Sequence, residues 1–195
     1  MHPGAQLCVF ILTAIFPVCI QDQDATLKTL SNRAGWSIQY PADWSAKSCH
    51  ACEDLTDTLI EFVDFHPPRY EGGSVKLEIS RRKPDGVSLD ELFDRIKAPN
   101  SRDAYILEEE RVTVEELPAL LVVYSGPAKT PGKGLQHEIT FIIGHHNVFS
   151  IALFSPPKIR MGDPIIPIKQ LKNYDLYQKM VGLFRQGDES SYPGN

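Results

Sequence analysis

Two cysteines at a C-x-x-C spacing are the first residues of this sequence that could do chemistry. Cys49 and Cys52 flank His50 a few residues after Trp44. A redox-active pair needs its first cysteine at the start of a helix, where the thiolate is stabilised. A structural zinc site needs two more ligands, and the sequence has no second C-x-x-C and no H-x-x-x-H. We therefore expect a local Cys49–Cys52 disulfide, with free thiols or a redox or metal role as the alternatives.

The histidines are the next candidates for a site. His145 and His146 lie in the run G-H-H-N, which is typical of a hairpin turn. Together with His137, or with Asp64 and His66, they could in principle bind a divalent cation. Their spacing fixes no coordination geometry, so the sequence predicts a solvated turn and no metal site.

No other motif reaches the strength of a catalytic or cofactor signature. The segment G-P-A-K-T-P-G-K-G has five residues between Gly126 and Gly132 where a phosphate-binding loop has four, and Gly134 replaces its hydroxyl residue. No G-x-S-x-G nucleophile motif occurs. The glutamates at 108–110 and 115–116 indicate a solvated strand edge, with an acidic cation-binding patch as the alternative. We therefore predict no catalytic residue, cofactor or metal.

Length and charge restrict the class of protein. The chain has 195 residues, 42% of them hydrophobic and 23% charged, which suits one globular domain. Its net charge of −5 argues against non-specific binding to nucleic acid, since phosphate contact needs a basic surface. The same charge weighs against docking on anionic lipid.

The N-terminal residues predict export. Residues 7–20 are almost entirely apolar and the chain turns polar at Gln21. This stretch is too short to span a bilayer comfortably but matches the apolar core of a secretory signal peptide. We predict a signal peptide over 1–24 and a periplasmic or secreted protein. The alternatives are a lipid on Cys19 and an uncleaved apolar helix. We expect membrane attachment only if Cys19 carries a lipid. After export Cys49 and Cys52 would be the remaining cysteines, in an oxidising compartment that favours their disulfide.

Periodicity predicts strands and two helices. Alternation places Trp36, Ile38 and Tyr40 on one strand face, with Trp44 as an anchor beyond a turn. We expect these aromatic residues to be buried, with a ligand platform as the alternative. Residues 21–34 read as a polar arm. Further strands are predicted over 59–65, 74–81, 105–114, 119–126, 135–143 and 147–154, and helices over 88–98, begun by a capping box at Ser88 and Glu91, and 174–185.

These elements predict an α+β domain. The strands are joined mostly as antiparallel hairpins, and each helix has one apolar stripe that must cover a sheet face. We expect an antiparallel β-sheet sandwiched between helices, an α/β/α arrangement with one helix on each side.

The segment G-W-S-I-Q-Y-P-A-D-W at 35–44 resembles the opening of PsbP-like domains, and the order of elements agrees over about residues 33–186. The resemblance implies an α/β/α sandwich over 33–186, with 187–195 as a polar tail. Members of this family include a photosystem-associated subunit, a yeast Ran-binding factor and exported bacterial proteins or lipoproteins. The C-H-A-C segment and the long connection over 155–173 depart from the family pattern. Because members of this family have unrelated functions, the fold by itself does not predict the function of this chain.

We therefore expect an exported, non-catalytic domain that binds a protein or envelope component and no nucleic acid. The predicted binding surface combines a loop, a hairpin tip and a Pro-rich connection; its residues are Lys129, Lys133, His145, His146 and Arg160. The alternatives are an extracytoplasmic thiol–disulfide protein that uses Cys49 and Cys52, and a cytosolic chaperone or adaptor of the same fold.

Overall fold

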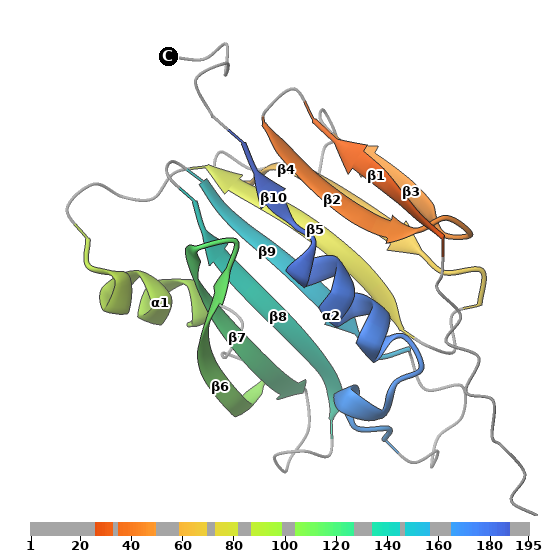
Figure 1. Ribbon diagram of the computed structural model, residues 1–195. Coiled ribbons are helices and arrows are strands. Elements are labelled where there is room, and N and C mark those ends of the chain that lie inside the picture. Colours follow the sequence, from red (N-terminus) through yellow and green to blue (C-terminus); the bar gives the residue numbers. More distant parts are fainter. Residues whose placement is uncertain are drawn as a thin grey trace, which may run out of the picture.

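The computed structural model describes residues 26–32, 35–49, 59–69, 73–81, 87–98, 104–126, 134–144, 147–156 and 165–187. Figure 1 shows strands and two α-helices. In chain order the elements are β1 (Leu27–Ser31), β2 (Trp36–Pro41), β3 (Ser45–Cys49), β4 (Leu59–His66), β5 (Ser74–Arg81), α1 (Leu89–Lys97), β6 (Tyr105–Val114), β7 (Leu117–Gly126), β8 (Leu135–Ile143), β9 (Asn147–Phe154), the 3₁₀ turn η3 (Ile168–Gln170), α2 (Tyr174–Gly182) and β10 (Arg185–Gln186).

The strands form two antiparallel sheets, so the α+β class is confirmed while the expectation of one sheet is wrong. The smaller sheet has the order β1-β2-β10, and the larger has the order β3-β4-β5-β9-β8-β7-β6. The expected polar arm contains β1, which pairs along its whole length with β2. Lys28 fixes this strand because its ammonium donates to the carbonyls of Ala42 and Trp44 and lies over the Tyr40 ring. β1 was not predicted from the sequence because about half of its residues are polar, and the strand is stabilised by its pairing with β2.

The larger sheet carries apolar side chains on both faces. In β7, Leu120, Val122 and Tyr124 belong to one core cluster, while Ala119 and Val123 belong to the other. This alternation follows from the two-residue period of a strand. The first cluster includes Leu92 and Phe93 of α1. The second includes the buried side chains of the α2 segment and of β2, namely Trp36, Ile38, Tyr40, Tyr177, Met180, Val181 and Phe184. We call the two faces the α1 side and the α2 side.

Both helices begin close to their predicted positions. The Ser88 side chain accepts a hydrogen bond from the Glu91 backbone N–H at 3.2 Å, so the predicted helix cap is confirmed. The α2 helix ends at Gly182, earlier than predicted, because Arg185 and Gln186 pair with β2 instead. In the described part of the chain, no helix has the length and apolar character needed to cross a bilayer.

The β6–β7 hairpin has an unusual turn. Glu115 and Glu116 join the two strands with φ angles of 51° and 68°. A type I′ turn requires this left-handed geometry, which glycine or asparagine adopts more easily than glutamate. Both glutamates are exposed, and Glu108 to Glu110 on β6 are exposed at the sheet edge, so the prediction of a solvated acidic edge is confirmed.

Candidate functional site

The predicted binding residues lie outside the described residues. This holds for Lys129, Lys133, His145, His146 and Arg160, so that surface stays a prediction.

The C-x-x-C segment begins at the end of an edge strand. Cys49 is the last residue of β3, pairs with Phe62 of β4 and is 7% exposed. The residues that follow Cys49, 50–58, lie outside the described residues, so the helix that a thioredoxin-type nucleophile needs at this point is not tested. Cys52 lies outside the described residues, so the predicted disulfide stays a prediction.

A row of aromatic side chains crosses three central strands on the α1 side. The rings of Tyr124 and His137 stack with centroids 5.0 Å apart, and those of His137 and Phe154 stack at 5.6 Å. The strand register produces this row, because Tyr124 pairs with His137 and His137 pairs with Phe154. The row continues to the sheet edge, since Ile106 of β6 is the partner of Tyr124.

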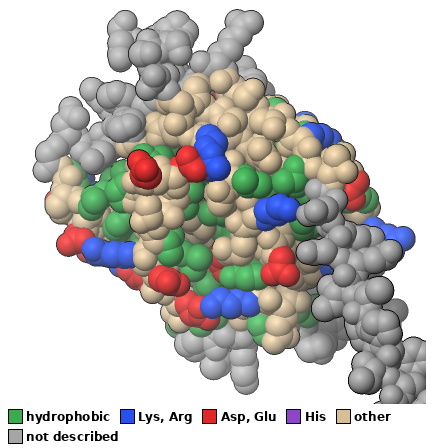
Figure 2. All heavy atoms as spheres, in the orientation of Figure 1, with side chains coloured by type: hydrophobic (Ala, Val, Ile, Leu, Met, Phe, Trp, Pro, Cys, Tyr) green, Lys and Arg blue, Asp and Glu red, His purple; other side chains and the backbone are tan. Residues whose placement is uncertain are grey.

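Three large apolar side chains in this row or next to it are exposed to solvent. Ile106 is 38% exposed, Leu135 is 36% exposed and Phe154 is 37% exposed. The α1 helix reaches the row at Tyr124, whose hydroxyl donates to the Lys97 carbonyl at the helix end. We call Ile106, Leu135, His137 and Phe154 the apolar patch. Figure 2 shows the opposite, α2 side, where hydrophobic side chains lie in small groups between charged ones.

The rings of His137 and Tyr124 in this row are uncharged at physiological pH. Burial lowers the pKa of His137, so its imidazole is neutral over a wider pH range than usual. Burial likewise raises the pKa of Tyr124, which keeps its hydroxyl protonated. Hydrogen bonds to Asp94 and Glu109 raise the pKa of Lys97 and hold its ammonium next to the row. The side chains of the apolar patch are thus uncharged, and the nearby Lys97 ammonium is neutralised by its ion pairs with Asp94 and Glu109.

A second group of chemically distinctive residues lies beneath α2. Glu138 and Thr140 of β8 are buried on the α2 side, and Tyr177 is fully buried above them. The Tyr177 hydroxyl is 2.9 Å from the Thr140 hydroxyl and donates to the Ile151 carbonyl at 3.1 Å. Gln178 donates to Glu138 Oε1 at 2.7 Å. We call Glu138, Thr140, Tyr174, Tyr177 and Gln178 the α2 polar cluster.

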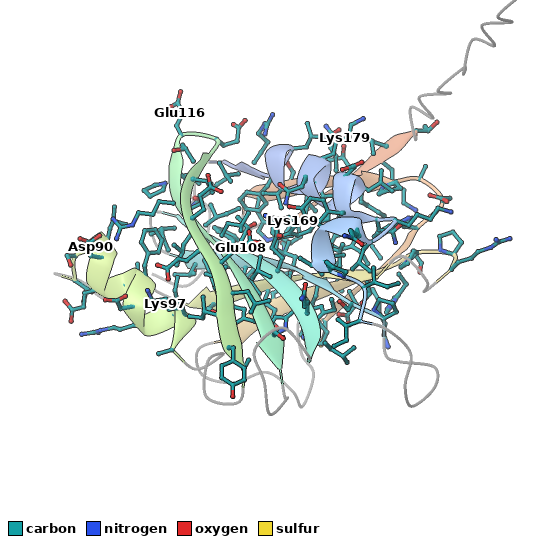
Figure 3. The ribbon with its side chains drawn as sticks, turned by 90° about the horizontal axis from the view of Figure 1, so that it is seen from below. Asp90, Lys97, Glu108, Glu116, Lys169 and Lys179 are labelled. Atoms are coloured by element: carbon teal, nitrogen blue, oxygen red, sulfur yellow. The ribbon has the colours of Figure 1, made fainter. Side chains whose placement is uncertain are left out.

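An ion pair stands at the rim of this cluster. Lys169 of η3 donates to Glu108 of β6 at 2.5 Å, and this hydrogen bond raises the pKa of Lys169. Figure 3 shows the two side chains between η3 and β6, and shows Glu116 at the tip of the β6–β7 hairpin. Within the described stretches, no group of three or more His, Cys, Asp or Glu side chains could hold a metal ion. The α2 polar cluster consists of hydroxyl, amide and carboxyl groups that form hydrogen bonds, and Glu138 is its carboxyl group.

The fold agrees with a known structure. The solution structure of cyanobacterial PsbP (CyanoP) from Synechocystis sp. PCC 6803 matches with a TM-score of 0.57 at 13% sequence identity, over 86% of this chain and 96% of that one. The chain has a PsbP-like fold. The predicted resemblance is thereby confirmed for the fold, whereas an identity this low carries no function across.

The remaining comparisons add no argument about function. A crystal structure from Bacteroides thetaiotaomicron VPI-5482 matches with a TM-score of 0.42 at 12% identity, over 85% of this chain and 51% of that chain. No protein-family model matches the sequence. No curated protein is similar enough in sequence to be matched.

Sequence reasoning missed both groups of residues for identifiable reasons. His137 was considered only as a metal ligand, because its stacking depends on residues 13 and 17 positions away that only strand register brings next to it. The apolar patch was missed because Leu135 and Phe154 belong to strongly apolar strands that read as core. A signal for Glu138 did exist: it is a single acidic residue inside a predicted apolar strand, in phase with Thr140.

Proposed function

We propose that this PsbP-like chain is an exported, non-catalytic domain that binds a protein partner through the apolar patch. Its architecture in this proposal is an α/β/α sandwich, in which α1 and α2 cover opposite faces of the larger sheet and leave one end of the α1 side open. The partner contributes apolar or aromatic side chains that lie against Ile106, Leu135 and Phe154.

The observation that carries the proposal is the exposure of Leu135 and Phe154 beside the stacked His137, with the exposed Ile106 beyond Tyr124 at the sheet edge. Single exposed apolar residues are normal on a protein surface, whereas a contiguous group is typical of an interaction site. Leu135 and His137 lie two positions apart on β8, and Phe154 lies opposite His137 on β9. Rigid aromatic groups on a sheet lose little conformational entropy when they bind, which favours their use in recognition.

Export is supported by the sequence. Residues 7–20 have the apolar character of a signal peptide, and the first described strand, β1, starts at Leu27. In this proposal the mature protein is periplasmic or secreted, and Cys49 and Cys52 form a disulfide there. The competing role as a thiol–disulfide exchanger has no support from the described residues, because Cys49 is buried and reactive cysteines are partly exposed.

Site-specific crosslinking tests the binding role. A photo-crosslinking amino acid is placed at position 154, and a matched control is placed at Leu89, which is also 37% exposed but lies at the start of α1. The proteins are exposed to extract of the extracytoplasmic compartment. We expect one discrete protein adduct from position 154, lost when Leu135→Ser is added, and none from position 89. Equal adducts from both positions, or no adduct from 154, would refute the proposal.

A further inference from the structure

Glu138 is a carboxyl group in a place that suits an uncharged side chain. It is fully buried in the middle of β8 on the α2 side. Its partners on the two neighbouring strands are Val123 of β7 and Leu153 of β9, both buried and apolar. Burying an ionised carboxylate among such neighbours is costly unless donors or cations compensate it.

The compensation around Glu138 is incomplete. Oε1 accepts a hydrogen bond from Gln178, while Oε2 is buried and has no hydrogen-bond partner among the residues described. An ionised carboxylate offers about four acceptor positions, whereas a protonated one needs fewer donors because one oxygen carries hydrogen. The geometry therefore fits a carboxylic acid better than a carboxylate.

The charged and titratable groups that face Glu138 come from α2, η3 and β6. Tyr174 lies near the carboxyl and is neutral at physiological pH, since burial and the charge of Glu138 raise its pKa to about 12. The ammonium of Lys169 is already engaged by Glu108. Burial, as the largest cause, raises the pKa of Glu138 above its ordinary value, and repulsion by Glu108 adds to this, while hydrogen bonding by Tyr174 and Gln178 and the charge of Lys169 oppose the rise without cancelling it. The full set of facing groups is Glu108, Lys169, Tyr174 and Tyr177.

The helix above Glu138 links the two sheets. The α2 segment is attached to the larger sheet by hydrogen bonds from Asn173 to the Gly73 carbonyl, from Tyr177 to Ile151, and from Gln178 to Glu138. It continues directly into β10, which pairs with β2 of the smaller sheet. A change in how firmly α2 packs therefore affects the contact between both sheets.

We propose that Glu138 is a proton-binding group of the folded domain: when protonated it allows α2 to pack firmly on the larger sheet, and when it loses the proton the packing of α2 and β10 weakens. The packing of α2 and β10 would then be firmest in a mildly acidic environment. This inference is independent of the proposed partner, since the apolar patch lies on the other side of the sheet.

The sign of the effect follows from linkage. A carboxyl whose pKa is raised in the folded state binds a proton more strongly there than in the unfolded chain. Its stabilising contribution is fully present below the ordinary glutamate pKa of about 4.3 and is lost as the pH rises through the folded value. Between the ordinary and the folded pKa, one linked proton raises the equilibrium constant for opening by up to about tenfold per pH unit, and above the folded pKa the constant levels off.

Hydrogen exchange of the full chain tests the proposal. Opening constants for α2 and for β9 are measured from pH 5 to pH 9 by mass spectrometry, with correction for the intrinsic exchange rate. We expect the α2 constant to rise with pH relative to that of β9, and Glu138→Gln to abolish this rise. The matched control is Glu116→Gln, which removes an exposed carboxylate and should leave the rise unchanged. An α2 constant that follows β9 at every pH, or a rise that persists in Glu138→Gln, would overturn the proposal.

A second measurement covers the case in which Glu138→Gln does not fold. The side-chain carboxyl ¹³C resonance of Glu138 is followed by NMR in the unsubstituted protein. A titration midpoint well above about 4.3 supports the proposal, and a midpoint at or below it overturns the proposal.

Discussion

The hydrogen bonds of Tyr177 allow a prediction whose size can be worked out from the structure. Tyr177→Phe removes one hydroxyl from a fully buried position and keeps the ring that packs in the core. Because the Tyr177 hydroxyl donates its hydrogen to the Ile151 carbonyl, Thr140 must be the donor of the other bond. The variant therefore deletes two hydrogen bonds and leaves the Thr140 hydroxyl buried without an acceptor.

The expected loss of stability is about 2–3 kcal/mol. Each buried hydrogen bond contributes about 0.5–1.5 kcal/mol net, and an unsatisfied hydroxyl costs about 1–3 kcal/mol. Thr140→Val should cost less, about 1 kcal/mol, because Tyr177 keeps its bond to Ile151. In the double variant the Thr140 hydroxyl is absent, so the combined loss should fall short of the sum by about 1 kcal/mol.

Urea unfolding of the four proteins, followed by tryptophan fluorescence, measures these differences as a double-mutant cycle. The matched control is Tyr105→Phe on β6, where the side chain is 40% exposed and the change should stay within about 0.5 kcal/mol. Losses that simply add, within about 0.3 kcal/mol, would refute the inference that Thr140 donates to Tyr177. A Tyr177→Phe variant as stable as the control would refute the role of the hydroxyl altogether.

Three further predictions concern local features. Glu116→Gly should raise the free energy of unfolding by about 0.5–1 kcal/mol, because the left-handed backbone costs a non-glycine residue about 1–2 kcal/mol, more than the extra entropy that glycine loses on folding. The control Glu116→Gln keeps the left-handed geometry, and a Glu116→Gly variant no more stable than this control would contradict the reasoning. Ser88→Ala should cost about 1 kcal/mol in urea unfolding because the Glu91 N–H loses its acceptor, whereas Ser88→Asp should keep most of that stability. Because burial lowers the pKa of His137, the folded domain should lose stability as the pH falls below the ordinary histidine pKa of about 6.5. His137→Phe should flatten the plot of unfolding free energy against pH between about pH 7 and pH 5, and an unchanged slope in that variant would show that other groups are responsible.

Local signals in the sequence were sufficient for most elements. The strands at 74–81, 105–114, 135–143 and 147–154 have the predicted bounds. Each contains a run of apolar or alternating residues between turn residues, which is information held within ten residues of chain. The cap at Ser88 is equally local, because the serine and the N–H that it accepts are three positions apart.

Other elements depend on partners far away in the chain. β1 and β3 were not predicted, because the first has only half-buried and exposed residues and the second is the polar segment Ser45–Cys49 at a sheet edge. Each forms because a neighbouring strand supplies hydrogen bonds along its length. The two-residue strand β10 has no sequence signal of its own and is defined by its pairing with Trp36 and Ser37.

Of the candidate sites, the sequence by itself determined the residue types and the order of the strands that carry them. It placed Glu138 and Thr140 in one strand, and it placed Tyr177 on the apolar stripe of the last helix. Only the tertiary structure decided that Glu138 is buried with one oxygen unpartnered, and that His137 stacks between Tyr124 and Phe154 beside exposed apolar groups. The physical reason is that hydrophobic periodicity acts over neighbouring residues, whereas burial and stacking depend on register between strands that the chain brings together from separate segments.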